Sequence, residues 1–151
     1  MKFLSTSSSN YSAMIVRITL GLVILPHGLQ KLLGMFGWNG FSGTMEYFTT
    51  GASLPWIIAL LVILGESLGA LALVLGFISR FMAFGIFVIM TWAMFMAHIK
   101  YGFFIDWFGA QEWQGVEFHL LTIGMALSLM ISGGWAYSLD GLLTKCFAKK
   151  K

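Results

Sequence analysis

The chain has 151 residues, of which 58% are hydrophobic and 10% are charged, and its mean hydropathy is +0.85. Soluble domains carry roughly 25% charged residues, so this composition excludes an ordinary soluble domain and indicates an integral membrane protein of one domain, 1–151. The net charge of +3 does not indicate a nucleic-acid partner, because the basic residues lie near the ends of apolar stretches, where membrane lipid headgroups and topology account for them.

Four apolar stretches predict transmembrane helices at about 11–34, 54–76, 80–101 and 115–135. Each is close to the roughly 20 residues that a helix needs to cross the hydrocarbon core. A helix satisfies its own backbone groups in lipid, which a lone strand cannot. The sequence therefore predicts an all-α membrane protein, a four-transmembrane-helix bundle. The first stretch has no convincing cleavage site, which favours a retained helix over a signal peptide.

The connections between these stretches alternate in length, with long ones at 35–53 and 102–114 and a short one at 77–79. Antiparallel neighbours then place both long loops on one side of the membrane. The positive-inside rule assigns the basic side to the cytoplasm, and the residues on that side are Lys2, Arg80, Lys145, Lys149, Lys150 and Lys151. We therefore expect both termini in the cytoplasm and both long loops outside.

Both long loops are rich in aromatic residues. The first contains Phe36, Trp38, Phe41, Tyr47 and Phe48, and the second contains Phe103, Phe104, Trp107, Phe108 and Trp113. Aromatic residues commonly form a belt at the level of the lipid headgroups. Alternatively, the loops fold over the outer mouth of the bundle and line a pocket for a flat lipophilic ligand. The sequence leaves both interpretations open.

Glu66 lies inside the second apolar stretch, where a carboxylate costs a few kcal/mol or more and rarely lacks a partner or a function. It lies about ten residues from the inner end of that stretch and Arg17 about six residues into the first, so their depths are roughly 15 and 9 Å at 1.5 Å per residue. We therefore expect an Arg17–Glu66 ion pair between adjacent helices. Such a pair either fixes helix register or belongs to a functional site.

Titratable residues also collect at the outer ends of three predicted helices. They are His27 and Lys31 on the first helix, His98 and Lys100 on the third, and Glu117 and His119 on the fourth. A lone histidine at this depth is more often structural. Titratable groups that converge on a membrane cavity from three helices usually handle protons or ligands, so we expect the functional site here.

A metal or haem site is not expected. The three histidines and Glu117 are of ligand types that bind zinc or copper, but no two of them have H-x-x-x-H spacing, and Glu117 and His119 point to different faces of a helix. Cys146 is the single cysteine, so the chain has no dithiol redox centre of its own.

Four motifs, in order, resemble the DoxX family of small four-helix membrane proteins. The first stretch reads R-I-T-L-G-L-V-I-L-P-H-G-L-Q-K-L (Arg17 to Leu32), and the second reads G-E-S-L-G-A-L-A-L-V-L-G-F-I-S-R (Gly65 to Arg80). Glu117 begins the fourth helix, and Y-S-L-D (Tyr137 to Asp140) is similar to the family's C-terminal motif. The resemblance covers Ile15 to Leu143. It implies a bacterial-type cytoplasmic (inner) membrane protein linked to quinone-dependent oxidoreduction.

These observations lead to a functional hypothesis: a membrane subunit of a quinone-linked oxidoreductase system that binds a quinone near the outer face. We expect His27, Glu66 and Glu117 to move protons. The residues expected to bind the quinone are Arg17, Lys31, Trp38, Arg80, His98, Trp107 and His119. Electrons would come from a partner subunit or substrate, and a homo-oligomer is also open. The alternatives are a non-catalytic anchor for a soluble redox partner and a carrier of a small molecule or metal.

Overall fold

The computed structural model describes residues 11–109, 113–134 and 136–148, and every regular element in these ranges is helical. Helix α1 spans Tyr11–Leu33. The second apolar segment, Trp56–Leu75, consists of α3 (Trp56–Leu64), the π-turn η4 (Gly65–Gly69) and α4 (Ala70–Leu75). The third, Ser79–Tyr101, consists of α5 (Ser79–Ala93), the π-turn η5 (Met94–His98) and the short 3-10 turn η6 (Ile99–Tyr101). The all-helical fold is confirmed.

These three segments are long and apolar enough to cross a membrane, whereas the fourth apolar helix is shorter. Helix α6 covers Glu117–Ser132, 16 residues, and ends at Gly133, whose φ is +91°. A rise of 1.5 Å per residue gives it a length of about 24 Å, less than the roughly 30 Å of the hydrocarbon core. Of the expected span at 115–135, residue 135 lies outside the described residues.

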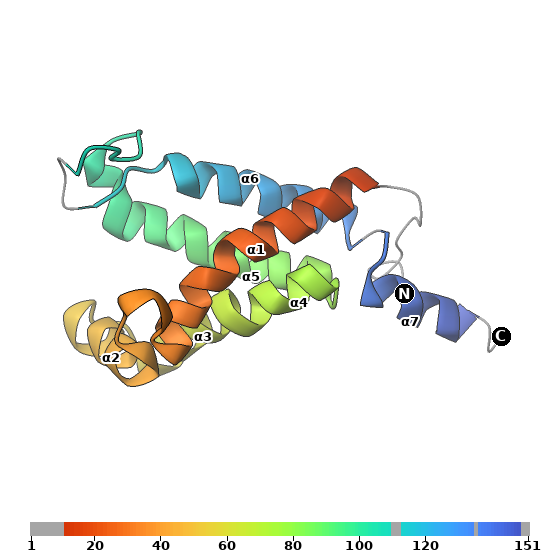
Figure 1. The fold of residues 1–151 in the computed structure, drawn as a ribbon, viewed down its shortest axis with the longest axis horizontal. Helices are drawn as coiled ribbons and strands as arrows, with labels where there is room; N and C mark the ends of the chain where they lie inside the picture. The colour runs from red at the N-terminus through yellow and green to blue at the C-terminus, as the bar shows by residue number, and fades with distance from the viewer. Residues whose placement is uncertain (1–10, 110–112, 135, 149–151) are drawn as a thin grey trace.

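Two helical regions lie outside the expected spans. The first long connection holds η2 (Met35–Gly37), α2 (Gly40–Glu46) and the π-turn η3 (Tyr47–Gly51), so most of it is ordered as short helices. Helix α7 (Leu139–Ala148) follows α6 and lies beyond the bundle (Figure 1). Both regions lack a long apolar run, which is the signal on which the expected spans were based.

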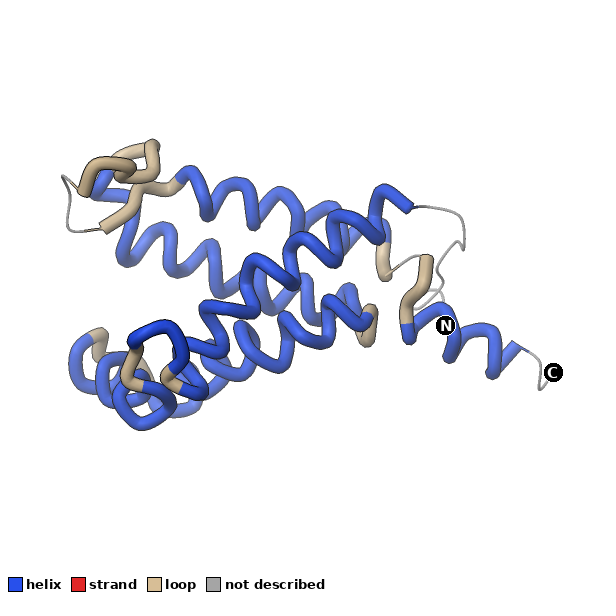
Figure 2. Tube along the Cα trace, viewed as in Figure 1, coloured by secondary structure: helices blue, strands red, loops and turns tan. Residues whose placement is uncertain are grey.

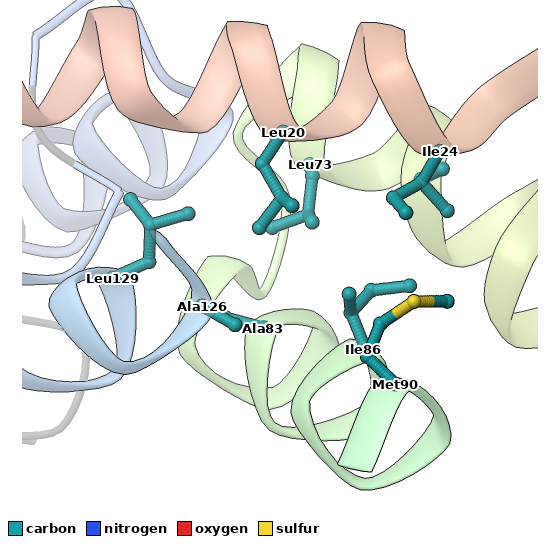
Figure 3. Close-up of a cluster of buried hydrophobic side chains, with 9 residues drawn as sticks. Leu20, Ile24, Leu73, Ala83, Ile86, Met90, Ala126 and Leu129 are labelled. Atoms are coloured by element: carbon teal, nitrogen blue, oxygen red, sulfur yellow. The ribbon is translucent and has the colours of Figure 1, made fainter. Parts of the chain in front are cut away.

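The main core is formed where α1, α4, α5 and α6 meet. Its fully buried or nearly buried side chains come from all four helices (Figure 3) and include Leu20, Ile24, Leu73, Ala83, Ile86, Met90, Ala126 and Leu129. Because lipid is as apolar as these side chains, close packing holds membrane helices together more than the hydrophobic effect does. A smaller cluster, Met45, Ala59 and Ile63, fixes α2 against α3.

The two ends of the bundle differ. Both long connections lie at one end, which we call the loop end (Figure 2). The other end, which we call the turn end, holds the tight turn between α4 and α5 and the start of α7. The loop end contains residues 27–31 of α1 and residues 94–101 of the third segment. Titratable residues of both ranges line the same cavity.

Candidate functional site

Lys31 and Glu66 form an ion pair at the loop end of the bundle. Lys31 Nζ donates a hydrogen bond to Glu66 Oε2, and the two side chains are 20% and 5% exposed. Gly28 makes this possible, because a Cβ atom at that position would overlap the Glu66 carbonyl group. The backbones of α1 and η4 therefore touch, and Lys31, almost one turn after Gly28, reaches the carboxylate.

The expected Arg17–Glu66 pair is wrong. The Arg17 side chain is buried at the turn end, where Nη2 donates to the Tyr137 carbonyl oxygen at 3.3 Å. A Cβ at Gly76 would collide with the Arg17 guanidinium group. Ten residues separate Glu66 from Gly76, about 15 Å of helix. Counting depth from the ends of the apolar stretches did not reveal which turns of the helices face each other.

Asp140 closes the turn end. Its carboxylate accepts hydrogen bonds from the backbone N–H groups of Ile78 (2.8 Å) and Ser79 (2.9 Å), and its own N–H donates to the Gly76 carbonyl oxygen at 2.9 Å. These N–H groups begin α5, where no local side chain caps the helix. A carboxylate at a helix N-terminus satisfies orphan donors and interacts favourably with the helix dipole. The sequence motif contained Asp140, but no function was assigned to it.

Arg80 also lies at the turn end, where its Nη2 donates to the Ser132 carbonyl oxygen at 3.4 Å. Arg17 and Arg80 are therefore far from Glu66 along the bundle, and neither lines the cavity described below. Both fix the packing of the turn end. Their expected part in ligand binding receives no support from this placement.

The loop end contains a cavity of about 750 Å³, which we call the head cavity. The acidic, basic and histidine residues that line it come from α1, η4, the third segment and α6, and they are His27, Lys31, Glu66, His98, Lys100 and His119. Most of the remaining lining is apolar or aromatic. This composition, apolar walls with a few convergent polar groups, is typical of small-molecule sites.

The three histidines occupy distinct positions in the head cavity. The rings of His98 and His119 lie 4.2 Å apart between centroids, and the His27 ring lies 5.7 Å from that of Phe118. His98 Nδ1 lies 2.7 Å from the Gln114 carbonyl oxygen, so Nδ1 carries a proton, and in the neutral ring Nε2 is the acceptor. His119 Nδ1 is buried with no hydrogen bond of normal geometry within the described residues.

Two π-turns carry key residues of this cavity. Glu66 lies in η4, and His98 is the last residue of η5. A π-turn adds one residue to a helical turn and occurs frequently at functional sites. Here the turns direct a carboxylate and an imidazole into the same space, one from the second segment and one from the third.

The first connection forms part of the cavity wall. Trp38 Nε1 donates to Thr44 Oγ1 at 3.1 Å, and Thr44 Oγ1 donates to the Lys31 carbonyl oxygen at 3.2 Å. Trp38, Tyr47 and Trp113 all line the cavity. Aromatic residues of both loops therefore contribute to a pocket, as the second interpretation of the loops expected.

Besides Arg17 and Arg80, two more expected site residues lie outside the head cavity. Trp107 is 79% exposed at the tip of the second loop. The Glu117 carboxylate accepts a hydrogen bond from the Ile105 N–H at 3.2 Å, and its own N–H donates to the Phe103 carbonyl oxygen at 2.9 Å, so it orders the loop. Thr44, in α2, and Gln114 also line the cavity and were missed, because both lie in the long connections, outside the apolar stretches that predicted helices.

Among the described residues, no group of three or more His, Cys, Asp or Glu side chains is placed to hold one metal ion. Cys146 is exposed on α7, at the opposite end from the head cavity.

The family model described as DoxX matches residues 12–99. The match begins in α1 and ends just after His98, so it includes Lys31, Glu66 and two of the three histidines, whereas α6 with His119 follows it. No curated protein and no solved structure matches the chain.

Proposed function

This chain belongs to the DoxX family of membrane proteins, and we propose that it is the membrane subunit of a quinone-linked oxidoreductase system that binds a quinone in the head cavity. One observation carries the proposal. An ion pair and three histidines from four elements face one largely apolar space with aromatic walls. The geometry of the cavity supports binding of a ligand, whereas the redox role in this proposal comes from the family resemblance.

The lining of the head cavity supports a quinone head group as ligand. Quinone carbonyl oxygens accept hydrogen bonds, and a flat ring packs well between aromatic side chains. Lys31 has three N–H donors, of which Glu66 occupies one. His27 and His119 can each present a ring N–H. The volume of about 750 Å³ lies within the usual range for small-molecule sites.

Protons would come from residues of this chain and electrons from elsewhere. Reduction of a quinone to a quinol takes up two electrons and two protons. Glu66 and the His98–His119 pair all line the head cavity and can pass protons to an oxygen held there. Cys146 is the single cysteine of the sequence, so the chain has no dithiol, and we propose that a partner protein or substrate donates the electrons.

The proposed topology has both termini in the cytoplasm and the loop end at the outer face of the inner membrane. The turn end carries Arg80 and is followed by the Lys-rich C-terminal segment, and the positive-inside rule assigns such an end to the cytoplasm. The head cavity then opens near the outer face. A protein partner or a second copy of the chain would complete the redox system.

The test is quinone binding by the purified protein in lipid nanodiscs, with mass spectrometry of extracted lipids and thermal unfolding on the same preparations. His27→Ala should weaken quinone binding by about tenfold, as expected when one charged or polar contact worth about 1.4 kcal/mol is lost, without lowering the unfolding temperature. Thr19→Ala, an exposed position on the same helix, is the control.

Two results would contradict the proposal. If His27→Ala and the double variant Lys31→Met/Glu66→Gln both bind quinone like the parent, the ligand is not in the head cavity. If the parent binds no quinone but co-purifies with a soluble redox enzyme, the anchor function is the better explanation. The exposed loop residues Trp107 (79%) and Phe108 (96%) would suit that role.

A further inference from the structure

A second space adjoins the head cavity on the surface of the bundle. It has a volume of about 920 Å³ and lies between α3, η4 and α4 on one side and α5 on the other. We call it the apolar groove. No charged side chain lines it among the described residues. Side chains such as Leu61, Leu68, Phe81, Phe84 and Val88 line it and are 46–60% exposed, so it opens to the surroundings of the bundle, which in a membrane are lipid.

Three residues belong to both spaces. Val62, Ile89 and Trp92 line the head cavity and the apolar groove alike. A molecule that occupies both would place a polar group near Lys31 and Glu66 and an apolar chain between α3–α4 and α5. From Ile58 to Ala72 the groove follows about 21 Å of helix, more than half of the roughly 30 Å hydrocarbon core.

We infer that the apolar groove holds the isoprenoid tail of the quinone whose head group lies in the head cavity, and that it is the lateral entrance from the bilayer. This inference rests on the proposed function and specifies its substrate class: a tailed, membrane-dissolved quinone rather than a small soluble one. A quinone dissolved in lipid approaches from the side of the bundle. The groove provides that approach without exposing a polar group to hydrocarbon.

The tail should contribute shape selectivity. Transfer of an apolar chain from lipid to an apolar groove gains little from the hydrophobic effect, because both surroundings are apolar. The groove therefore contributes through packing, which depends on free space between the helices. Filling that space should exclude the tail and leave the head cavity intact.

Gly85 and Gly124 provide a matched pair of variants. A Cβ at either position meets no heavy atom within 4 Å, so neither substitution creates a clash at that atom. Gly85 lines the groove on α5, whereas Gly124 is an exposed residue of α6 that lines neither space. Gly85→Leu fills the groove, and Gly124→Leu is its control.

The experiment compares these variants in nanodiscs of one phospholipid, with two benzoquinones that share a head group, one carrying two isoprene units and one carrying none. A tail concentrates a quinone in lipid whatever the protein does, so the comparison is made between variants for the same quinone. Gly85→Leu should bind the tailed quinone about tenfold or more weakly and the tail-less one within about twofold. Gly124→Leu should bind both like the parent.

Other results would overturn the inference, and they differ from failure of the proposed function. If Gly85→Leu binds both quinones like the parent, the tail lies elsewhere. If Gly85→Leu instead loses a co-purified phospholipid, or turns a dimer into a monomer, with quinone binding intact, the groove holds a lipid chain or a second copy. If the parent binds neither quinone, the proposed function itself is wrong.

Discussion

Lys31 and Glu66 place opposite charges side by side at the loop end, so removal of one charge leaves the other buried without a partner. Lys31→Met should lower the free energy of unfolding by about 3 kcal/mol, the lower end for breaking a buried pair. The double variant Lys31→Met/Glu66→Gln should recover part of this loss. Denaturation in mixed micelles should give a coupling of about 1–3 kcal/mol.

The matching control is the pair that the sequence alone favoured. Arg17 and Glu66 share no contact and lie at opposite ends of the interface between α1 and the second segment. Arg17→Met and Glu66→Gln should therefore have additive effects on unfolding, within about 0.5 kcal/mol. A coupling above 1 kcal/mol between Arg17 and Glu66, with none between Lys31 and Glu66, would contradict the helix register described here.

Asp140 accepts two backbone hydrogen bonds at the start of α5, and a charged acceptor makes such bonds stronger. Asp140→Ala should lower the free energy of unfolding by about 2–3 kcal/mol, and Asp140→Asn by less, because the amide keeps one acceptor oxygen. Thermal unfolding in detergent is the measurement. Glu46→Gln, at an exposed position, should change the free energy of unfolding little. If it lowers that free energy as much as Asp140→Ala does, Asp140 is not a specific cap of α5.

Glycine sets the distance between α1 and the second segment. Gly28 and Gly21 both face the backbone of η4 and α4, and a Cβ at Gly21 would lie 2.9 Å from the Ala70 carbonyl oxygen. Gly28→Ala should therefore destabilise the bundle by about 1–3 kcal/mol, as overpacking does. The same change should weaken quinone binding, because it separates Lys31 from Glu66.

Gly124→Ala, the same substitution at a glycine in another helix, is the control for Gly28→Ala. Its Cβ meets open space, so the substitution should stabilise α6 by about 0.5–1 kcal/mol, the usual gain of alanine over glycine inside a helix. The two alanine variants should thus shift the unfolding temperature in opposite directions. A stabilised Gly28→Ala variant would show that α1 does not approach η4 this closely.

Apolar runs predicted the helical elements well and their pairing poorly. Segments Trp56–Leu75 and Ser79–Tyr101 agree closely with the spans expected from hydropathy, because length and composition alone identify them. Which turn of α1 faces which turn of the second segment depends on the contacts of Gly21 with α4 and of Gly28 with η4, and these cannot be deduced from composition. The expected ion pair was therefore assigned to Arg17, whereas the register brings Lys31 to Glu66.

For the molecule as a whole, the proposed orientation predicts which positions a membrane-impermeant thiol reagent can reach in intact cells. Cys146 should be protected until the cells are opened. In a Cys146→Ser background, Ser42→Cys and Phe108→Cys, both at exposed positions of the loop end, should be labelled from outside. Labelling of Cys146 in intact cells, with both loop cysteines protected, would reverse the orientation.

At this scale, most of the titratable residues expected at the outer end of the bundle line the head cavity, whereas Glu117 does not. His27, Lys31, His98 and His119 do line one cavity with Glu66. Glu117 lies two residues before His119 in the sequence, yet it orders the second loop, because its carboxylate accepts a hydrogen bond from the Ile105 N–H. Helical spacing predicts the depth of a residue, whereas the loop that folds back over it decides which partner it meets.

The π-turns η4 and η5 have a consequence for how this protein tolerates change. Each turn holds one residue more than a regular α-helical turn, so removing a single residue from it would restore α-helical geometry with little rotation of the flanking helices and would change the direction of the side chains within the turn. Glu66 or His98 would then face away from the other groups although every side chain kept its identity. The site thus depends on the number of residues along these two segments as much as on their chemistry. Short deletions there should be more damaging than most substitutions.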